Sequence, residues 1–237
     1  MNFSERLISW FEKYYYTAPL LIIVEIVALI LGIAYVKKDK TGFLFILYIS
    51  FDICLFLIFI YWGFFADNRK SASVFVLYTN PVTSFIELSV YYYFFIGVIS
   101  NKRIIQMMKV SGFIYGLAIL VFLITKIAFL SLRFSYISYL LGAIEFLLLL
   151  PPCFAFFYEL INTRSDIKLL DRPSFWIASG IFLFCLLSIP YYLINRYIVS
   201  SKTEMRFILT AMFFYLPFTI NFLFLIKAFS CKKKLTI

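Results

Sequence analysis

The sequence predicts an all-α fold, a polytopic membrane helix bundle with about seven transmembrane helices. Of its 237 residues, 64% are hydrophobic and only 14% are charged, whereas a typical soluble domain carries about 25% charged residues. The apolar residues form long runs and not amphipathic stripes, and ~20 consecutive apolar residues suffice to cross a bilayer. Short charged clusters such as Lys37–Lys40 and Asp67–Lys70 separate these runs.

Residues 1–237 are expected to form a single integral membrane domain. Residues 1–16 form a possible interfacial helix, because Trp10 and Tyr14 suit the headgroup boundary. Residues 17–230 form the seven-span bundle, and residues 231–237 form a short basic cytoplasmic tail. The N-terminal segment lacks the features of a cleaved signal peptide, so the first span is expected to stay in the mature protein.

Seven apolar segments are expected to span the membrane, each bounded by charged or turn-forming residues. They cover approximately Pro19–Val36, Gly42–Phe65, Asn80–Ser100, Ile104–Leu130, Ser135–Ile161, Pro173–Ile198 and Phe207–Phe229. Asn80 and Pro81 are expected to open the third span, because Asn is a good N-cap and Pro fits the first helical turn. Prolines inside the last three spans, including Pro151, Pro190 and Pro217, are expected to kink their helices.

The distribution of basic residues predicts the orientation. An odd number of spans places the two termini on opposite sides of the membrane. The loops on the side of the C-terminal tail, with Lys232–Lys234, carry the larger share of Lys and Arg. The positive-inside rule therefore predicts the N-terminus outside and the C-terminus inside the cytoplasm.

Carboxylates inside the apolar runs are the most informative polar residues. Glu25, Glu87 and Glu145 are separated by 62 and 58 residues, which is about the length of two spans with their connections. They are therefore expected to enter the membrane from the same side, at similar depth and facing the bundle interior. Asp52 lies about ten residues into the second span. A carboxylate near mid-bilayer costs about 2.5–3.5 kcal/mol, so all four acids are candidate ligand- or ion-binding residues.

The chemistry of these acids has three alternatives at this stage. They bind a cation or a cationic ligand, they relay protons, or they hold neighbouring helices together as neutral hydrogen-bonding groups. Lys126 and Arg133 are the nearest candidate cationic partners, and Lys227 is expected to snorkel towards the headgroups. Asn221 and Gly180 are expected to have structural roles between helices.

Aromatic residues gather in dense clusters. These clusters are Tyr91–Phe95, Phe154–Tyr158 and Tyr191–Tyr192. They are compatible with an aromatic pocket for an apolar or cationic ligand. They are equally compatible with interfacial aromatic belts and with a compositional bias towards Phe and Tyr.

Composition also argues against several functions. The chain has no His, which removes the commonest general base and metal ligand. Its four cysteines form no CxxC pair and do not resemble a zinc site. We therefore expect no metal, no cofactor and no enzymatic activity. The net charge of +10 is expected to serve topology and contact with the lipid bilayer and not nucleic-acid binding.

Three segments carry a resemblance to a known family. They read NPVTSFIELSVYYYFFIGV (Asn80–Val98), AIEFLLLLPPCFAFFYELI (Ala143–Ile161) and DRPSFWIASGIFLF (Asp171–Phe184). Their order resembles a poorly characterised seven-helix membrane family of Gram-negative bacteria, similar to the membrane sensory regions ahead of some histidine kinases. The resemblance implies a sensory or signalling accessory in the bacterial inner membrane.

The signalling hypothesis requires a separate partner, because only three residues follow Lys234. A separate histidine kinase or response regulator is the expected partner. The loop before Pro173 is the candidate docking site, through the charged residues Arg164, Asp166, Lys168, Asp171 and Arg172. The alternative function is a transporter or channel subunit that uses the buried carboxylates, although the sequence shows no inverted repeat. The oligomeric state and the ligand stay open.

Overall fold

The structure is a computed structural model, and it describes residues 17–36, 42–64, 69–128, 135–162, 169–200 and 203–231. These residues form helices and their connections, with no β-strand among them, so the all-α prediction is confirmed. The elements are α2 (Thr17–Val36), α3 (Phe43–Phe64), α4 (Arg69–Val98), α5 (Lys102–Ala128), α6 (Ser135–Asn162), η2 (Leu169–Asp171), α7 (Pro173–Ser200), α8 (Thr203–Thr210), η3 (Ala211–Tyr215) and α9 (Leu216–Phe229).

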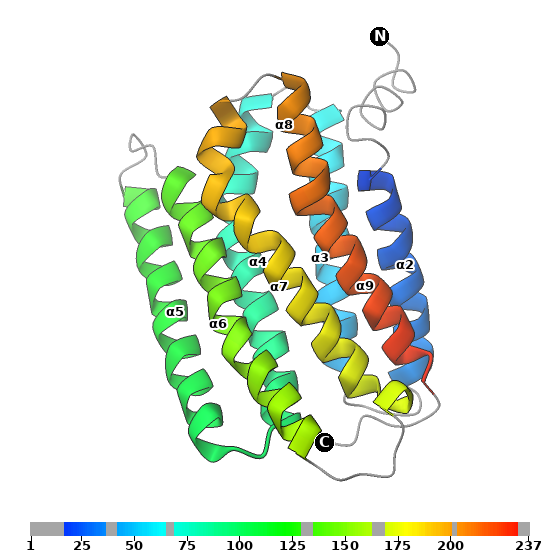
Figure 1. Ribbon diagram of the computed structural model, residues 1–237. Helices are drawn as coiled ribbons and strands as arrows, with labels where there is room; N and C mark the ends of the chain where they lie inside the picture. Colours follow the sequence, from blue (N-terminus) through cyan, green and yellow to red (C-terminus); the bar gives the residue numbers. More distant parts are fainter. Residues whose placement is uncertain are drawn as a thin grey trace.

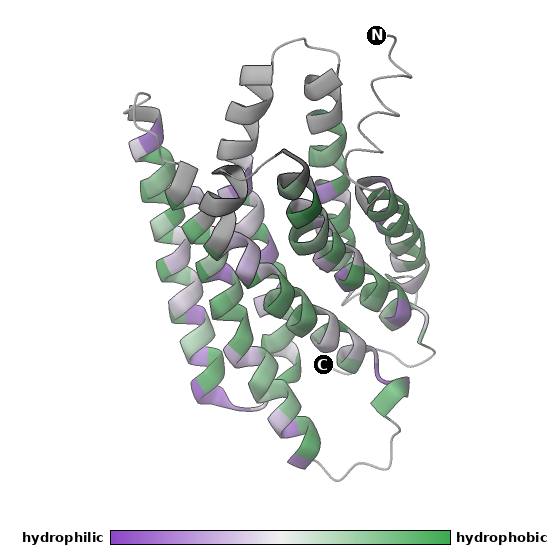
Figure 2. Ribbon diagram, turned by 45° about the horizontal axis from the view of Figure 1, so that its top comes forward, coloured by the Kyte–Doolittle hydropathy of each residue, from purple (hydrophilic) through white to green (hydrophobic). Residues whose placement is uncertain are grey.

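The described helices have the dimensions and surface of membrane-spanning helices. Six of them are long and apolar enough to cross a bilayer, and α3 contains a shorter apolar stretch, Phe43–Ile58. Large apolar side chains face outwards, among them Phe113, which is 69% exposed, and Val121. Apolar residues dominate the helices along most of their length (Figure 2). A soluble protein rarely exposes a continuous apolar surface, so the chain is a multi-pass membrane protein.

The helices are arranged as a ring with one helix outside it. Contacts join α2 to α3, α3 to α4, α4 to α6, α6 to α7, α7 to α9, and α9 back to α2. α5 packs on α4 and α6 from outside the ring (Figure 1). α8 and η3 continue into α9 as one rod, so the described chain forms seven rods. α2 begins at one end of the bundle and α9 ends at the other (Figure 1).

One predicted helix boundary is wrong. α4 begins at Arg69 and runs through Asn80 and Pro81 without a break, so the expected loop before Asn80 is helical. Proline lacks the N–H of a helical hydrogen bond, and the Thr83 hydroxyl donates to the Thr79 carbonyl at 3.0 Å immediately beyond it. Such side-chain bonds to the backbone help helices to accommodate proline within membranes.

The last rod contains a feature that the sequence did not predict. Pro217 lies inside this rod as predicted, at the start of α9 and directly after the π-helical segment η3. The Leu216 N–H donates to the carbonyl of Ala211, five residues earlier, in the π pattern. A π segment is a local widening of the helix, and such segments occur frequently at functional sites. Pro151, Pro152 and Pro190 lie inside α6 and α7 as predicted.

A glycine sets the distance between α7 and α9. A Cβ atom at Gly180 would lie 2.7 Å from the Phe224 Cβ and 3.1 Å from the Asn221 Oδ1. Real Cβ atoms do not approach that closely, so only glycine permits this packing. The predicted role of small residues in helix approach is confirmed here.

Candidate ligand-binding site

The four intramembrane acids come together in the bundle interior. The side chains of Glu25, Glu87 and Glu145 are 1%, 3% and 1% exposed, whereas that of Asp52 is partly exposed. They come from four different helices: α2, α3, α4 and α6. The prediction that the three glutamates face the interior and not lipid is confirmed, and Asp52 joins them.

Glu25 and Asp52 form the first pair. Their carboxyl groups lie within hydrogen-bonding range of each other, between α2 and α3. An ionised carboxylate only accepts hydrogen bonds. A hydrogen bond between the two therefore requires a proton on one of them.

Glu87 is the centre of a second group. Its carboxyl lies near the hydroxyls of Tyr48 on α3 and Tyr91 on its own helix, and near the Asp52 carboxyl. The Tyr48 hydroxyl is buried and makes no hydrogen bond. The Tyr91 hydroxyl in turn accepts a 2.6 Å hydrogen bond from the Asn221 amide on α9. The expected structural role of Asn221 is thus confirmed, and it ties α9 to the acid-bearing helices.

Glu145 lies at the far end of the same polar chain. Ser84 on α4 is within hydrogen-bonding range of both the Glu145 carboxyl and the Tyr115 hydroxyl. Tyr115 donates to the Leu141 carbonyl on α6 at 3.0 Å. These contacts link α4, α5 and α6 at the level of the acids.

A cavity of about 300 Å³ opens between these helices. It lies in the half of the bundle where α2 begins and where α3 and α7 end (Figure 1). Its described lining consists of carboxylates, hydroxyl and amide side chains, aromatic rings and two leucines: Leu21, Glu25, Asp52, Leu55, Phe56, Thr79, Asn80, Thr83, Ser84, Glu87, Tyr191, Tyr192, Thr210, Phe214, Tyr215 and Phe218. Glu145 is not among them, so it reaches the cavity only through Ser84.

The cavity has two chemically different walls. The acids Glu25, Asp52 and Glu87 come from α2, α3 and α4, whereas five aromatic rings come from α7, η3 and α9. The π segment contributes Phe214 and Tyr215 to the aromatic wall. None of the described lining residues is basic, so within this lining the carboxylates have no internal counter-ion.

The acid wall also contains unsatisfied acceptors. Glu25 Oε2 and Glu87 Oε1 are buried and make no hydrogen bond, and Glu145 Oε1 is in the same state outside the cavity. Leaving a buried polar group unsatisfied costs about 1–3 kcal/mol. Two such oxygens in the lining of one cavity point to a ligand that supplies positive charge or donors.

The acids are placed in a chain and do not converge on one point. Among the described residues, no group of three or more His, Cys, Asp or Glu side chains is arranged to hold one metal ion. A compact ion would need such a group. An organic cation with an apolar body matches the two walls better, because ammonium groups bind both carboxylates and aromatic faces.

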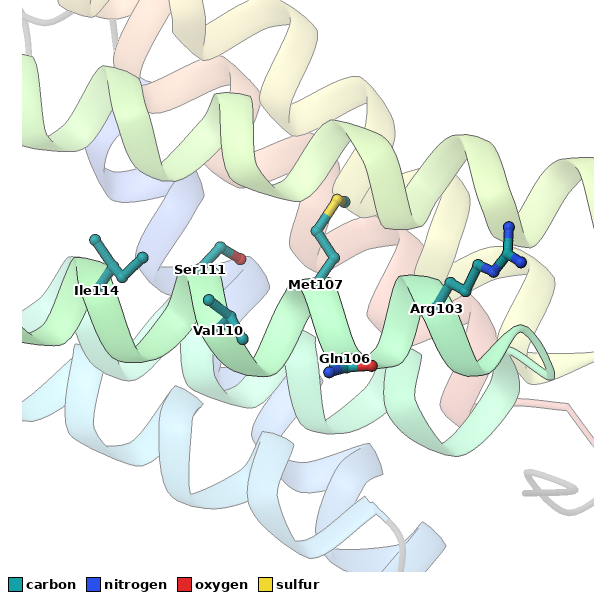
Figure 3. A pocket seen from close by; sticks show the side chains of 6 residues that line it. All are labelled: Arg103, Gln106, Met107, Val110, Ser111 and Ile114. Carbon is teal, nitrogen blue, oxygen red and sulfur yellow. The ribbon is translucent and has the colours of Figure 1, made fainter.

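A second hollow lies on α5. It measures about 390 Å³ and is bordered by Arg103, Gln106, Met107, Val110, Ser111 and Ile114. Figure 3 shows that all six side chains belong to this one helix. The hollow is therefore a surface feature of a single helix and is not enclosed between helices. None of its six residues has an unsatisfied buried polar atom. We therefore assign the binding site to the acid-lined cavity.

The remaining predicted residues have varied positions. Lys126 is buried and lies over the Phe122 ring, 5.5 Å from its centroid. Lys227 is exposed and lies over the Trp176 ring at 5.6 Å, near the end of α9. Arg133 is outside the described residues.

The predicted docking loop is described only in part. Asp171 is exposed in η2, and Arg172 next to it is half-buried. Arg164, Asp166 and Lys168 fall outside the described residues, as do residues 1–16 and the tail beyond Cys231. The docking role therefore stays a prediction.

The aromatic clusters divide between cavity and packing. Tyr191 and Tyr192 line the cavity. Tyr91 is buried beside Glu87, whereas Phe154 and Tyr158 are exposed on the outer surface. The cavity has aromatic rings in its lining, but half of them, Phe214, Tyr215 and Phe218, come from the segment around η3, which no predicted cluster included.

Comparison with family models, with curated proteins and with solved structures found no match for this chain. The resemblance to membrane sensory regions therefore stays a prediction. The argument for function rests on the cavity itself.

Proposed function

We propose that this multi-pass membrane protein binds a small organic cation in the acid-lined cavity and carries it across the membrane. The observation that supports binding is the pair of buried, unsatisfied oxygens, Glu25 Oε2 and Glu87 Oε1, on residues that line the same cavity as the aromatic rings. The volume of about 300 Å³ is at the lower end of small-molecule sites. It corresponds to about ten water molecules at ~30 Å³ each, which suits a small ammonium compound.

The helices that form the cavity favour transport of the cation over binding without transport. The aromatic wall is built on a π segment followed by Pro217 and on α7 near Pro190. Irregular helices around a buried site are typical of membrane transporters, in which the site is exposed alternately to the two sides. The distribution of basic residues supports a cytoplasmic C-terminus. A location in the bacterial inner membrane is supported only by the sequence resemblance.

A sensory accessory is the second candidate function. It is supported by the sequence resemblance of the segments from Asn80 onwards and by the charged surface at Asp171 and Arg172. In this case the cavity binds the same cation but does not release it on the other side. A separate histidine kinase or response regulator then reads the bound state.

Binding is tested with the purified full-length protein in detergent. Tetramethylammonium, choline and benzyltrimethylammonium are titrated in a calorimeter, with 3,3-dimethylbutan-1-ol as an uncharged analogue of choline. We expect at least one quaternary ion to bind, the alcohol to fail, and Glu87→Gln to weaken binding at least tenfold. Glu159→Gln is the matched control, because Glu159 accepts hydrogen bonds from Ser100 and Asn101 at the other end of α4. The proposal is wrong if no quaternary ion binds.

Carriage is tested separately from binding. The protein is reconstituted in liposomes, and uptake of the radiolabelled ion that binds best is followed. Uptake by wild type and its loss in Glu87→Gln support a carrier. Binding without uptake contradicts carriage and favours the sensory function.

A further inference from the structure

We propose that the Glu25–Asp52 pair is a proton-exchange site, at which the bound cation takes the place of the proton that the two carboxyl groups share. This inference rests on the proposed function, because it specifies how the same cavity binds its cation. It requires two carboxyl groups in mutual contact, open access from the cavity, and an incoming positive charge. The first two are features of the structure.

The hydrogen bond between the two carboxyls carries the argument. Glu25 on α2 and Asp52 on α3 lie within range of one such bond and both line the cavity. The bond needs a proton because two ionised carboxylates have no donor. Without that proton, two like charges would face each other in a low-dielectric interior, at several kcal/mol of repulsion. The proton therefore acts as the counter-ion of the empty site.

Glu25 also has an acceptor that no protein group uses. Glu25 Oε2 is buried and unsatisfied, and both Glu25 and Asp52 line the cavity. A cation in the cavity thus contacts the same pair that holds the proton. Once the cation is bound, its charge stabilises both carboxylates, and the shared proton leaves a carboxyl oxygen for water. One positive charge replaces another, so the net charge of the site is unchanged.

Other titratable groups line the same cavity and must be distinguished from the pair. They are Glu87 from α4, Tyr191 and Tyr192 from α7, and Tyr215 from η3, whereas α9 contributes only Phe218. Tyrosine hydroxyls ordinarily lose their protons near pH ~10, so at neutral pH they do not exchange. Glu87 differs from the pair because the nearby hydroxyls of Tyr48 and Tyr91 can donate to its carboxylate.

Proton exchange has a measurable linkage. If one proton is released for each bound cation, the apparent affinity rises about tenfold per pH unit across the range in which the pair is protonated. A quaternary ammonium ion is the appropriate probe, because it carries no titratable proton of its own. Any proton that appears on binding must then come from the protein.

The experiment is calorimetric titration of the full-length protein in detergent with the quaternary ion that binds best, repeated in buffers of different ionisation enthalpy. The dependence of the observed heat on the buffer gives the number of protons released. We expect about one proton per cation for wild type. For Glu25→Gln we expect binding with less than a third of that release, because the amide donates to Asp52 without a labile proton. Asp52→Asn is the second variant, with the same expectation, so that poor folding of one variant leaves the other.

The outcomes separate the two claims. Binding to wild type without proton release, or equal release from wild type and Glu25→Gln, overturns the exchange site but leaves the binding cavity in place. Equal release also assigns the proton to another group, of which Glu87 is the first candidate. Failure of all three quaternary ions to bind wild type overturns both the proposed function and this inference. Glu159→Gln is expected to match wild type in both affinity and proton release.

Discussion

Glu87 allows the binding role of the buried acids to be separated from their role in holding helices together. The hydroxyls of Tyr48 and Tyr91 lie near its carboxyl, and both tyrosines are almost fully buried. Glu87→Leu keeps a similar volume but removes both carboxyl oxygens. The Tyr91 hydroxyl then loses an acceptor, and the Tyr48 hydroxyl, which already makes no hydrogen bond, loses its polar neighbour. Hydrogen bonds between membrane helices contribute about 0.6–1.7 kcal/mol each. Leucine gains little in return, because lipid is as apolar as the bundle interior.

We therefore expect Glu87→Leu to lower the free energy of unfolding by about 1–3 kcal/mol. Glu87→Gln keeps one carbonyl acceptor and should lower it by less than about 1 kcal/mol. Both variants should lose cation binding, because both remove the charge. Stability then separates the two variants, whereas binding does not.

The assay is unfolding of the purified protein by SDS in mixed micelles, followed by circular dichroism. Binding of the best quaternary ion is measured on the same preparations. The reasoning is refuted if Glu87→Leu is as stable as wild type. It is also refuted if Glu87→Gln binds the cation as tightly as wild type does.

Two further predictions concern packing and topology. Gly180→Ala places a Cβ 2.7 Å from the Phe224 Cβ, which cannot move without its helix, so a loss of about 1–3 kcal/mol is expected. In Gly112→Ala the nearest atoms are carbons of the Tyr92 ring at 3.3 Å, so unfolding in SDS should show a smaller loss; equal losses would contradict this account. A C-terminal alkaline phosphatase fusion should be inactive and a fluorescent-protein fusion bright, and the opposite pattern would reverse the predicted orientation.

The common depth of Glu25 and Glu87 was predicted from the lengths of the spans, and the lengths of the helices extend it to Asp52, whereas Glu145 precedes the end of α6 by 17 residues. Glu25 and Glu87 lie on helices that run in the same direction, and each precedes the end of its helix by eleven residues. Asp52 follows the start of the antiparallel α3 by nine residues. At 1.5 Å per residue the three acids lie at nearly the same level. Their polarity turns them inwards, because lipid offers no hydrogen-bond partner.

The rest of the site was not predictable from hydropathy. The predicted loop before Asn80 rested on a favourable N-cap followed by proline, but packing and local side-chain bonds keep α4 helical through Pro81. As a consequence Thr79 and Asn80 belong to the middle of a helix and line the cavity. Propensity at a single position is a weak signal when a long helix is held by its neighbours.

The π segment was missed for a similar reason. No residue in Ala211–Tyr215 is unusual for a membrane helix, since a π segment depends on how the hydrogen bonds register and not on composition. The proline that follows, Pro217, supplies no N–H. Pro217 therefore predicts a kink in this helix. It does not predict the wider π-helical turn, which contributes Phe214 and Tyr215 to the cavity.

The division of the cavity into two walls has a consequence for how the site works. The acids belong to α2, α3 and α4, whereas the aromatic rings belong largely to α7, η3 and α9, where the helices are irregular. Asn221 on α9 bonds to Tyr91 on α4 and so joins the two halves directly. A cation that contacts both walls would draw the irregular half towards the acidic half around this fixed point. Exchange of the proton for the cation would then change both the charge at Glu25 and Asp52 and the distance between the two walls. Binding of the cation is thereby coupled to helix movement, and this coupling serves a carrier and a sensor alike.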